Sequence, residues 1–101
     1  MIAKNSTQKF ELGQIVATPA AIEAMNSAGQ NAREFLARHA KGDWGDVCPE
    51  DATANNQSLI DGSRLLSAYR LTTGEKIWLI TEAADDNGNR ASSTLLLPEE
   101  Y

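Results

Sequence analysis

Residues 64–82, with the sequence RLLSAYRLTTGEKIWLITE, decide the fold of this 101-residue chain. Apolar and polar residues alternate through much of both halves of the stretch, and a period of two is typical of β-strands. The segment TTGE at 72–75 lies between the halves, and a Thr-Gly turn between runs of aromatic and β-branched residues predicts a β-hairpin. We therefore expect an antiparallel pair of strands here.

A third strand is predicted after the hairpin. The polar loop DDNGN at 85–89 leads into RASSTLLL at 90–97, and Pro98 then ends the strand because proline cannot donate to a sheet ladder. The result is an antiparallel three-stranded meander from Arg64 to Tyr101. Residues 90–97 carry little charge to protect an edge, so this edge strand is predicted as the place where a homodimer would form.

Three helices are predicted before the meander. The first begins at Thr18-Pro19, because a threonine hydroxyl accepts a hydrogen bond from a free backbone N–H and proline fits the first helical position. Its apolar stripe includes Ile22 and Met25, and Gly29 ends it.

The second helix begins after Asn31, which has Glu34 three residues later as in a capping box, and it ends at Gly42. Its buried face carries Ala32, Phe35, Leu36 and His39. The third helix is predicted from about residue 50 to residue 60 and has little apolar content. Its packing residues are Ala52, Leu59 and Ile60.

The N-terminal segment divides into two parts. Residues 1–9 are polar and are predicted to form a flexible N-terminus, whereas 10–17 alternate well enough for a strand with a bend at Gly13. With 42% apolar residues, the chain can bury the core of one domain without disulfides. The prediction is a single α+β domain over 10–101, with an N-terminal strand and two to three helices packed on the C-terminal meander.

Charge and cysteine content exclude several functions. Fourteen acidic residues against nine basic ones give a net charge of −5, which repels phosphate backbones and disfavours direct DNA binding. The helix pair at 19–40 is therefore expected to be packed helices, not a helix-turn-helix reader of DNA. No stretch is long and apolar enough for a membrane span. The single cysteine, Cys48, and the polar N-terminus favour a cytoplasmic location.

Residues suited to catalysis are few. His39 is the only histidine, and the following loop adds the carboxylates of Asp43 and Asp46, which together form a candidate acid-base site. The favoured interpretation is structural: an imidazole at a helix C-terminus, with Trp44 folded over the apolar face. One His and one Cys are too few for structural zinc, and loop 85–89 lacks calcium ligands, so neither a metal nor another cofactor is predicted.

A second cluster lies on the predicted hairpin, where alternation places side chains on two faces. On the first strand one face carries Arg64, Leu66, Ala68 and Arg70, and the other carries Leu65, Ser67, Tyr69 and Leu71. On the second strand Trp78, Ile80 and Glu82 alternate with Ile77, Leu79 and Thr81. If helices cover only one face, the other exposes an aromatic residue with Arg and Glu, which is typical of binding hot spots. The alternative is a sheet buried on both sides. The predicted binding residues are Asp43, Trp44, Asp46, Tyr69, Arg70 and Trp78.

Four sequence blocks occur together in the chain: HxxGDWG at 39–45, RLLSAY at 64–69, IWLITE at 77–82 and LLPEEY at 96–101. With them the chain, from about Phe10 to Tyr101, resembles a family of small uncharacterised bacterial proteins labelled plasmid-related or phage-associated. The chain departs from that family at residues 83–93, where it has a longer loop in place of a tighter turn. The resemblance implies an association with a mobile element and no particular activity.

These observations predict an accessory protein, more plausibly not an enzyme, that binds another protein and competes as an acidic inhibitor for a nucleic-acid-binding partner. The order of elements is also similar to that of small toxin-like ribonucleases. That resemblance implies His39 as the acid-base residue, Arg64 or Arg70 on the phosphate, and Tyr69, Thr81 or Glu82 at the 2′-hydroxyl. The net charge opposes the ribonuclease, since such enzymes profit from a positive field. A third alternative is a site for a small ligand.

Overall fold

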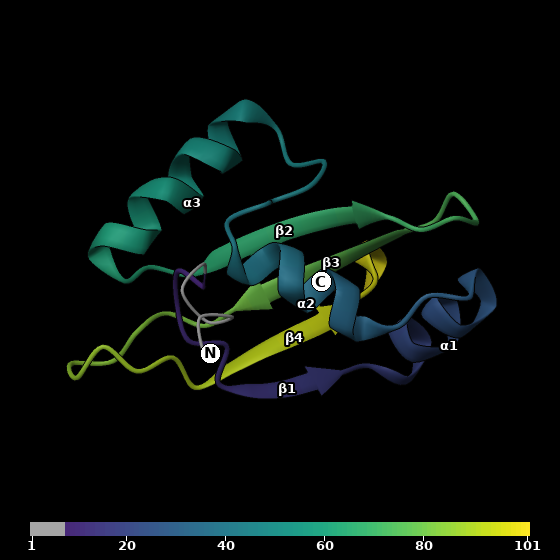
Figure 1. Cartoon of the computed structure of the whole chain (residues 1–101), viewed down its shortest axis with the longest axis horizontal. Coiled ribbons are helices and arrows are strands. Elements are labelled where there is room, and N and C mark those ends of the chain that lie inside the picture. Colours follow the sequence, from purple (N-terminus) through teal and green to yellow (C-terminus); the bar gives the residue numbers. More distant parts are fainter. Residues whose placement is uncertain (1–7) are drawn as a thin grey trace, which may run out of the picture.

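The computed structural model describes residues 8–101, so the flexible N-terminus predicted at residues 1–9 lies outside the described part of the chain except for Gln8 and Lys9. The elements are β1 (Gln14–Ala17), α1 (Pro19–Ala28), α2 (Ala32–Ala40), α3 (Pro49–Asp61), β2 (Leu65–Arg70), β3 (Lys76–Thr81), β4 (Ser92–Leu96) and the 3-10 helix η2 (Pro98–Glu100). This is an α+β fold, as the sequence predicts (Figure 1).

The strands form one sheet in the order β1-β4-β3-β2 (Figure 1). The antiparallel pairing of β2, β3 and β4 confirms the meander, while β1 joins β4 in parallel with Ile15 opposite Ser93. Strand β4 is therefore interior, and the prediction that residues 90–97 form a free edge is wrong. The lack of charge in β4 is explained by a strand with neighbours on both sides.

Strand β1 is shorter than the strand predicted at 10–17. The backbone of Gly13 is left-handed (φ 68°), and a Cβ there would lie 2.6 Å from the Ala91 carbonyl oxygen, so the chain bends before β1 begins. The segment before the bend runs beside α2 instead. There the Lys9 N–H donates to the Ala40 carbonyl oxygen (2.8 Å), and the Phe10 ring lies 5.1 Å from the His39 ring, edge to face.

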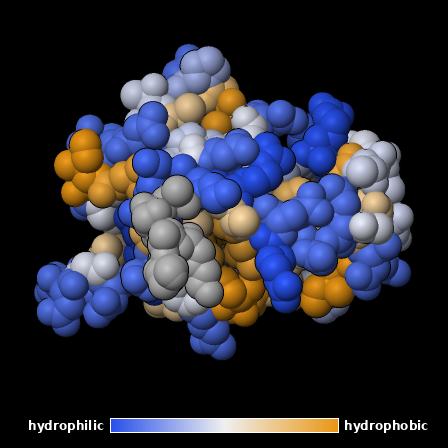
Figure 2. All heavy atoms as spheres, viewed as in Figure 1, coloured by the Kyte–Doolittle hydropathy of each residue, from blue (hydrophilic) through white to orange (hydrophobic). Residues whose placement is uncertain are grey.

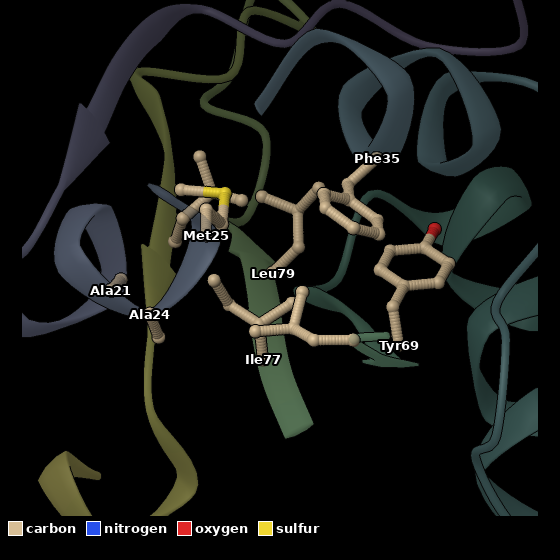
Figure 3. Packing of buried hydrophobic residues seen from close by; sticks show 9 residues of the cluster. Ala21, Ala24, Met25, Phe35, Tyr69, Ile77 and Leu79 are labelled. Carbon is tan, nitrogen blue, oxygen red and sulfur yellow. The ribbon is translucent and has the colours of Figure 1, made fainter. Parts of the chain in front are cut away.

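Helices α1 and α2 cover one face of the sheet and form the core with it (Figures 1 and 3). Figure 3 shows Met25 and Phe35 reaching from the helices toward Leu79 and Tyr69, and the rings of Phe35 and Tyr69 stack with centroids 5.4 Å apart. The buried stripe of α1 runs through its small residues Ala21 and Ala24 to Met25. The prediction that Ile22 is buried is wrong, since its side chain is 46% exposed.

Helix α3 lies along the outer edge of β2 and is held mainly by hydrogen bonds. Its buried residues are Asn55 and Ser58, whereas Ile60, predicted to pack, is 81% exposed. The buried Arg90 donates to three backbone carbonyl oxygens, those of Ser58 (3.1 Å), Ser63 (2.7 Å) and Glu82 (3.0 Å). Arg90 thus ties the C-terminal end of α3 to β3.

The outer edge of β2 is closed by Asn55 of α3 and by the backbone at 44–46. The side-chain amide of Asn55 donates to the Leu66 carbonyl oxygen (2.7 Å) and accepts from the Leu66 N–H (3.0 Å). Two residues further, the Ala68 N–H donates to the Trp44 carbonyl oxygen (3.0 Å), and the Ala68 carbonyl oxygen accepts from the Asp46 N–H (2.6 Å). At these two residues another chain cannot pair with β2.

We expect Asn55→Ala to lower the free energy of unfolding by about 1–2 kcal/mol, because it leaves both Leu66 backbone groups without their partner under α3. Urea unfolding measures the change. Thr53→Ala, at an exposed position of the same helix, is the matched control and is expected to change stability by less than about 0.5 kcal/mol. Equal effects of the two substitutions would show that Asn55 does not hold the strand edge.

Candidate functional site

The sheet has a second face, opposite α1 and α2, and it is the less covered of the two. The strand register places Leu66 beside Ile80, Ala68 beside Trp78 and Trp78 beside Leu96 on this face. Leu66 and Trp78 are partly exposed there, whereas Ala68, Ile80 and Leu96 are buried. The prediction of one helix-covered face therefore agrees with the position of Trp78, and Tyr69 belongs to the covered face.

An aromatic pair is the main feature of the second face. The exposed ring of Tyr101 packs on Trp78 with centroids 5.6 Å apart and a 60° angle between the planes. Arg64 donates to the Tyr101 hydroxyl (2.5 Å), and its guanidinium lies 5.6 Å from the centre of the same ring. Tryptophan, tyrosine and arginine are the residues most enriched among binding hot spots.

The C-terminal segment is fixed in place by Glu100. Its carboxylate accepts hydrogen bonds from the Leu97 N–H (2.8 Å) and from the Thr18 hydroxyl (2.7 Å). These hydrogen bonds, the Leu97 N–H first, lower the pKa of Glu100. Near neutral pH the charged carboxylate therefore holds η2, and with it Tyr101, against the sheet.

The loop at 43–46 has a structural role in this geometry. Asp43 accepts from Arg38 Nε (2.7 Å) and from the Gly45 N–H (3.1 Å), and the Arg38 hydrogen bond lowers the pKa of Asp43 most. Trp44 is buried and donates from its indole to Asn56 (3.2 Å). Asp46 is exposed and lies 3.8 Å from Arg70, also exposed, at the end of the second face.

His39 belongs to a buried chain of polar side chains on the covered face. Its Nδ1 lies 2.5 Å from Ser67 Oγ and its Nε2 lies 2.8 Å from Thr81 Oγ1. The chain continues from Thr81 to Ser93 Oγ (2.6 Å), which donates to the Leu12 carbonyl oxygen (2.7 Å). Because Ser93 donates onward, it accepts from Thr81, and Thr81 accepts from His39. The chain therefore places a proton on Nε2 of the imidazole.

Burial, with a smaller contribution from the charge of Arg90, lowers the pKa of His39 to about 4. The imidazole has no exposed surface (0%). A general base must reach a substrate proton, and this imidazole is instead enclosed by Phe10 and Trp44. Its geometry is that of a structural histidine.

The residues named for a ribonuclease fall on different parts of the molecule. His39, Tyr69 and Thr81 are buried, whereas Arg64 and Glu82 are exposed. The Tyr69 hydroxyl donates to the Asp43 carbonyl oxygen (2.6 Å), and burial raises the pKa of Tyr69 to about 12. Arg70, the alternative to Arg64, is also exposed. The structure does not bring these residues together on one exposed surface.

A cleft of about 760 Å³ opens between residues 8–11, the end of α3 and loop 84–90. Its acidic lining residues are Glu11, Asp61, Asp85 and Asp86. Arg90 also lines it, but its guanidinium is engaged by the carbonyl oxygens described above. The carboxylates of Asp61 and Asp85 accept from backbone N–H groups of their own turns. These bonds assign a local turn role to Asp61 and Asp85.

Two groups of residues were missed in the sequence. Tyr101 was not named as a binding residue, although an aromatic three residues after the strand-ending Pro98 is a usable signal. The buried chain was also missed, although Ser67, Thr81 and Ser93 are polar at positions whose strand neighbours are apolar. Polar residues on the otherwise apolar face of neighbouring strands indicate a shared partner.

None of the family models, curated proteins or solved structures compared with the chain matches it. Within residues 8–101, no three His, Cys, Asp or Glu residues are grouped so that they could hold a metal ion. No helix in the same range has the length and apolar character needed to cross a membrane. The fold and the second face are therefore the basis for a functional proposal.

Proposed function

We propose that the protein acts by binding another protein through the second face of its sheet. The observation that carries the proposal is the cluster of Trp78, Tyr101 and Arg64, of which Tyr101 is 63% exposed, on the face opposite α1 and α2. Partly exposed Leu66 extends this surface with apolar area. Aromatic and arginine anchors surrounded by apolar contacts are typical of protein interfaces.

The partner that we propose is a basic, nucleic-acid-binding protein. The net charge of −5 favours encounter with a basic surface and disfavours direct binding of nucleic acid. By covering a basic surface the protein would act as an acidic inhibitor, and the setting that we propose for it is a mobile element. The ribonuclease is the weaker proposal, because His39 has no exposed surface.

We expect Trp78→Ala to weaken binding of a partner, identified by affinity purification and then purified, by roughly 30-fold, the effect of losing a hot-spot residue of about 2 kcal/mol. Calorimetric titration of wild type and variant measures it, with circular dichroism as a check of folding. Ile60→Ala, which removes an exposed apolar side chain from α3, is the control and should leave affinity unchanged. Equal weakening by both substitutions, or none by Trp78→Ala, would overturn the proposal.

A further inference from the structure

The two edges of the sheet differ in whether their outward backbone groups are hydrogen-bonded. The edge of β2 is closed by Asn55 and by the backbone at 44–46, as described above. On β1, the Gln14 N–H donates to the Ala91 carbonyl oxygen (2.9 Å) and the Thr18 N–H to that of Leu95 (3.0 Å). Because donors alternate along a strand, the N–H and C=O groups of Ile15 and Ala17 point away from the sheet. Among residues 8–101 they have no backbone partner.

Apolar side chains are exposed beside this free edge. Ile15 is 44% exposed and Val16 43%, and Ile22, one turn into α1, is 46% exposed. Figure 2 shows hydrophobic atoms along the lower side of the molecule, in the region of β1 and the start of α1 in Figure 1. An edge strand with free backbone groups and exposed apolar side chains is suited to pair with another strand.

The charge around β1 has one sign. Residues 11–32 and 91–101, which contain β1, α1, β4 and η2, include no Lys, Arg or His. They include four exposed glutamates, Glu11, Glu23, Glu99 and Glu100. The next basic residue along the chain is Arg33, which Glu34 follows in the first turn of α2. Lys9 and Arg90 precede the two ranges in the sequence, and the guanidinium of Arg90 is engaged by three carbonyl oxygens. The segments that contain β1 and its neighbours are thus acidic, and the hydrogen bond from Thr18 to Glu100 places one carboxylate beside the end of β1.

We infer that the free edge of β1 takes up an extended, basic segment of the partner as an added strand. The inference rests on the proposed function and names the chemistry that the partner presents. Backbone groups of the segment pair with Ile15 and Ala17, and its basic side chains meet the glutamates. Its apolar side chains lie against Ile15 on the covered face or against Val16 on the second face. Val16 lies beside Thr94 in register, so the added strand continues the second face.

A second copy of this chain fits the edge less well. Pairing β1 with its own copy would bring both sets of glutamates together between two molecules that each carry a net charge of −5. Like charges placed together at an interface oppose association. A basic segment removes this repulsion and gains attraction, which is why charge decides between the two occupants.

The test uses a capped synthetic peptide of alternating lysine and valine, with a glutamate-valine peptide as control. We expect the basic peptide to bind at least about 10-fold more tightly at low salt, and salt to weaken it by screening. Ile15→Pro removes the outward N–H but no bond to β4, whereas Ile15→Ala removes only the side chain. Ile15→Pro is expected to weaken binding about 10-fold more than Ile15→Ala, as for loss of a backbone hydrogen bond with strand pairing.

Equal binding of the two peptides, or equal effects of the two Ile15 variants, would overturn the inference, as would a stable dimer that protects the Ile15 amide from hydrogen exchange without peptide. If Ile15→Pro fails to fold, Glu23→Lys replaces it and should weaken the basic peptide by about 3-fold or more. If a partner is found whose binding requires Trp78, but the wild type binds no peptide, this inference alone is overturned. If the wild type binds the basic peptide, but no partner is found whose binding requires Trp78, the proposed function alone is overturned.

Discussion

Lowering the pH from 7 to 5 is expected to lower the free energy of unfolding by about 2 kcal/mol, because the folded protein holds His39 neutral. Burial lowers the pKa of this imidazole from 6.5 to about 4. Between these two values the unfolded chain takes up a proton at His39 and the folded protein does not. Stability is therefore fully present above pH 6.5 and is lost as the pH falls toward 4.

The buried polar chain gives the neutral form a second reason to persist. Nδ1 of His39 accepts from Ser67, while Nε2 donates toward Thr81. A proton added to Nδ1 would remove the acceptor that the Ser67 hydroxyl uses, in a place that water does not reach. Protonation thus leaves the Ser67 hydroxyl as an acceptor from Nδ1, with its own proton unpaired, and it also buries a charge.

The measurement is urea unfolding of wild type and His39→Gln at pH 7, 6 and 5. Glutamine does not titrate, so the free energy of unfolding of the variant should change little between pH 7 and pH 5. Asp43, Asp61 and Glu100, whose pKa values are also lowered by hydrogen bonds, lose their contributions at lower pH, as it falls below their ordinary values of 3.8 to 4.5. An equal loss in wild type and variant would assign the acid sensitivity to carboxylates.

Local signals in the sequence predicted most of the fold. The turn at 72–75 and the alternation around it gave β2 and β3, and Thr18-Pro19 gave the start of α1, whose N-cap hydroxyl accepts from the Ala21 N–H (3.1 Å). The parallel addition of β1 to β4 could not be predicted this way. It joins residues about 80 positions apart, and periodicity says nothing about which strands become neighbours.

The same limit applies to the packing of α3. The few apolar residues of α3 predicted that Ile60 packs against the sheet, but Ile60 is exposed. The helix is attached instead by the hydrogen bonds of Asn55 to β2 and of Arg90 to the carbonyl oxygens of Ser58, Ser63 and Glu82. Polar attachments of this kind depend on geometry between segments. Strand alternation, a local signal, assigned Trp78 and Tyr69 each to one face of its own strand, but it left open which of these faces the helices cover.

Replacing Gly45 by alanine is expected to lower the free energy of unfolding by about 3 kcal/mol. The backbone of Gly45 is left-handed (φ 74°), which costs an alanine about 1 kcal/mol. A Cβ there would also overlap the Ala68 carbonyl oxygen and come within 2.7 Å of the Tyr69 ring. The loop must move away from β2 and lose its two backbone hydrogen bonds to Ala68, each contributing about 1 kcal/mol.

Gly74→Ala is the matched control, because Gly74 is also left-handed (φ 96°) but has no neighbouring atom within 4 Å of a Cβ. Its cost should be the backbone contribution alone, about 1 kcal/mol. Equal costs of the two substitutions would mean that the loop at 43–46 is not pressed against β2. If the loop does close this edge, Gly45→Ala should also increase association at high protein concentration, measured by light scattering, since it opens the side of the sheet that the wild-type chain keeps covered.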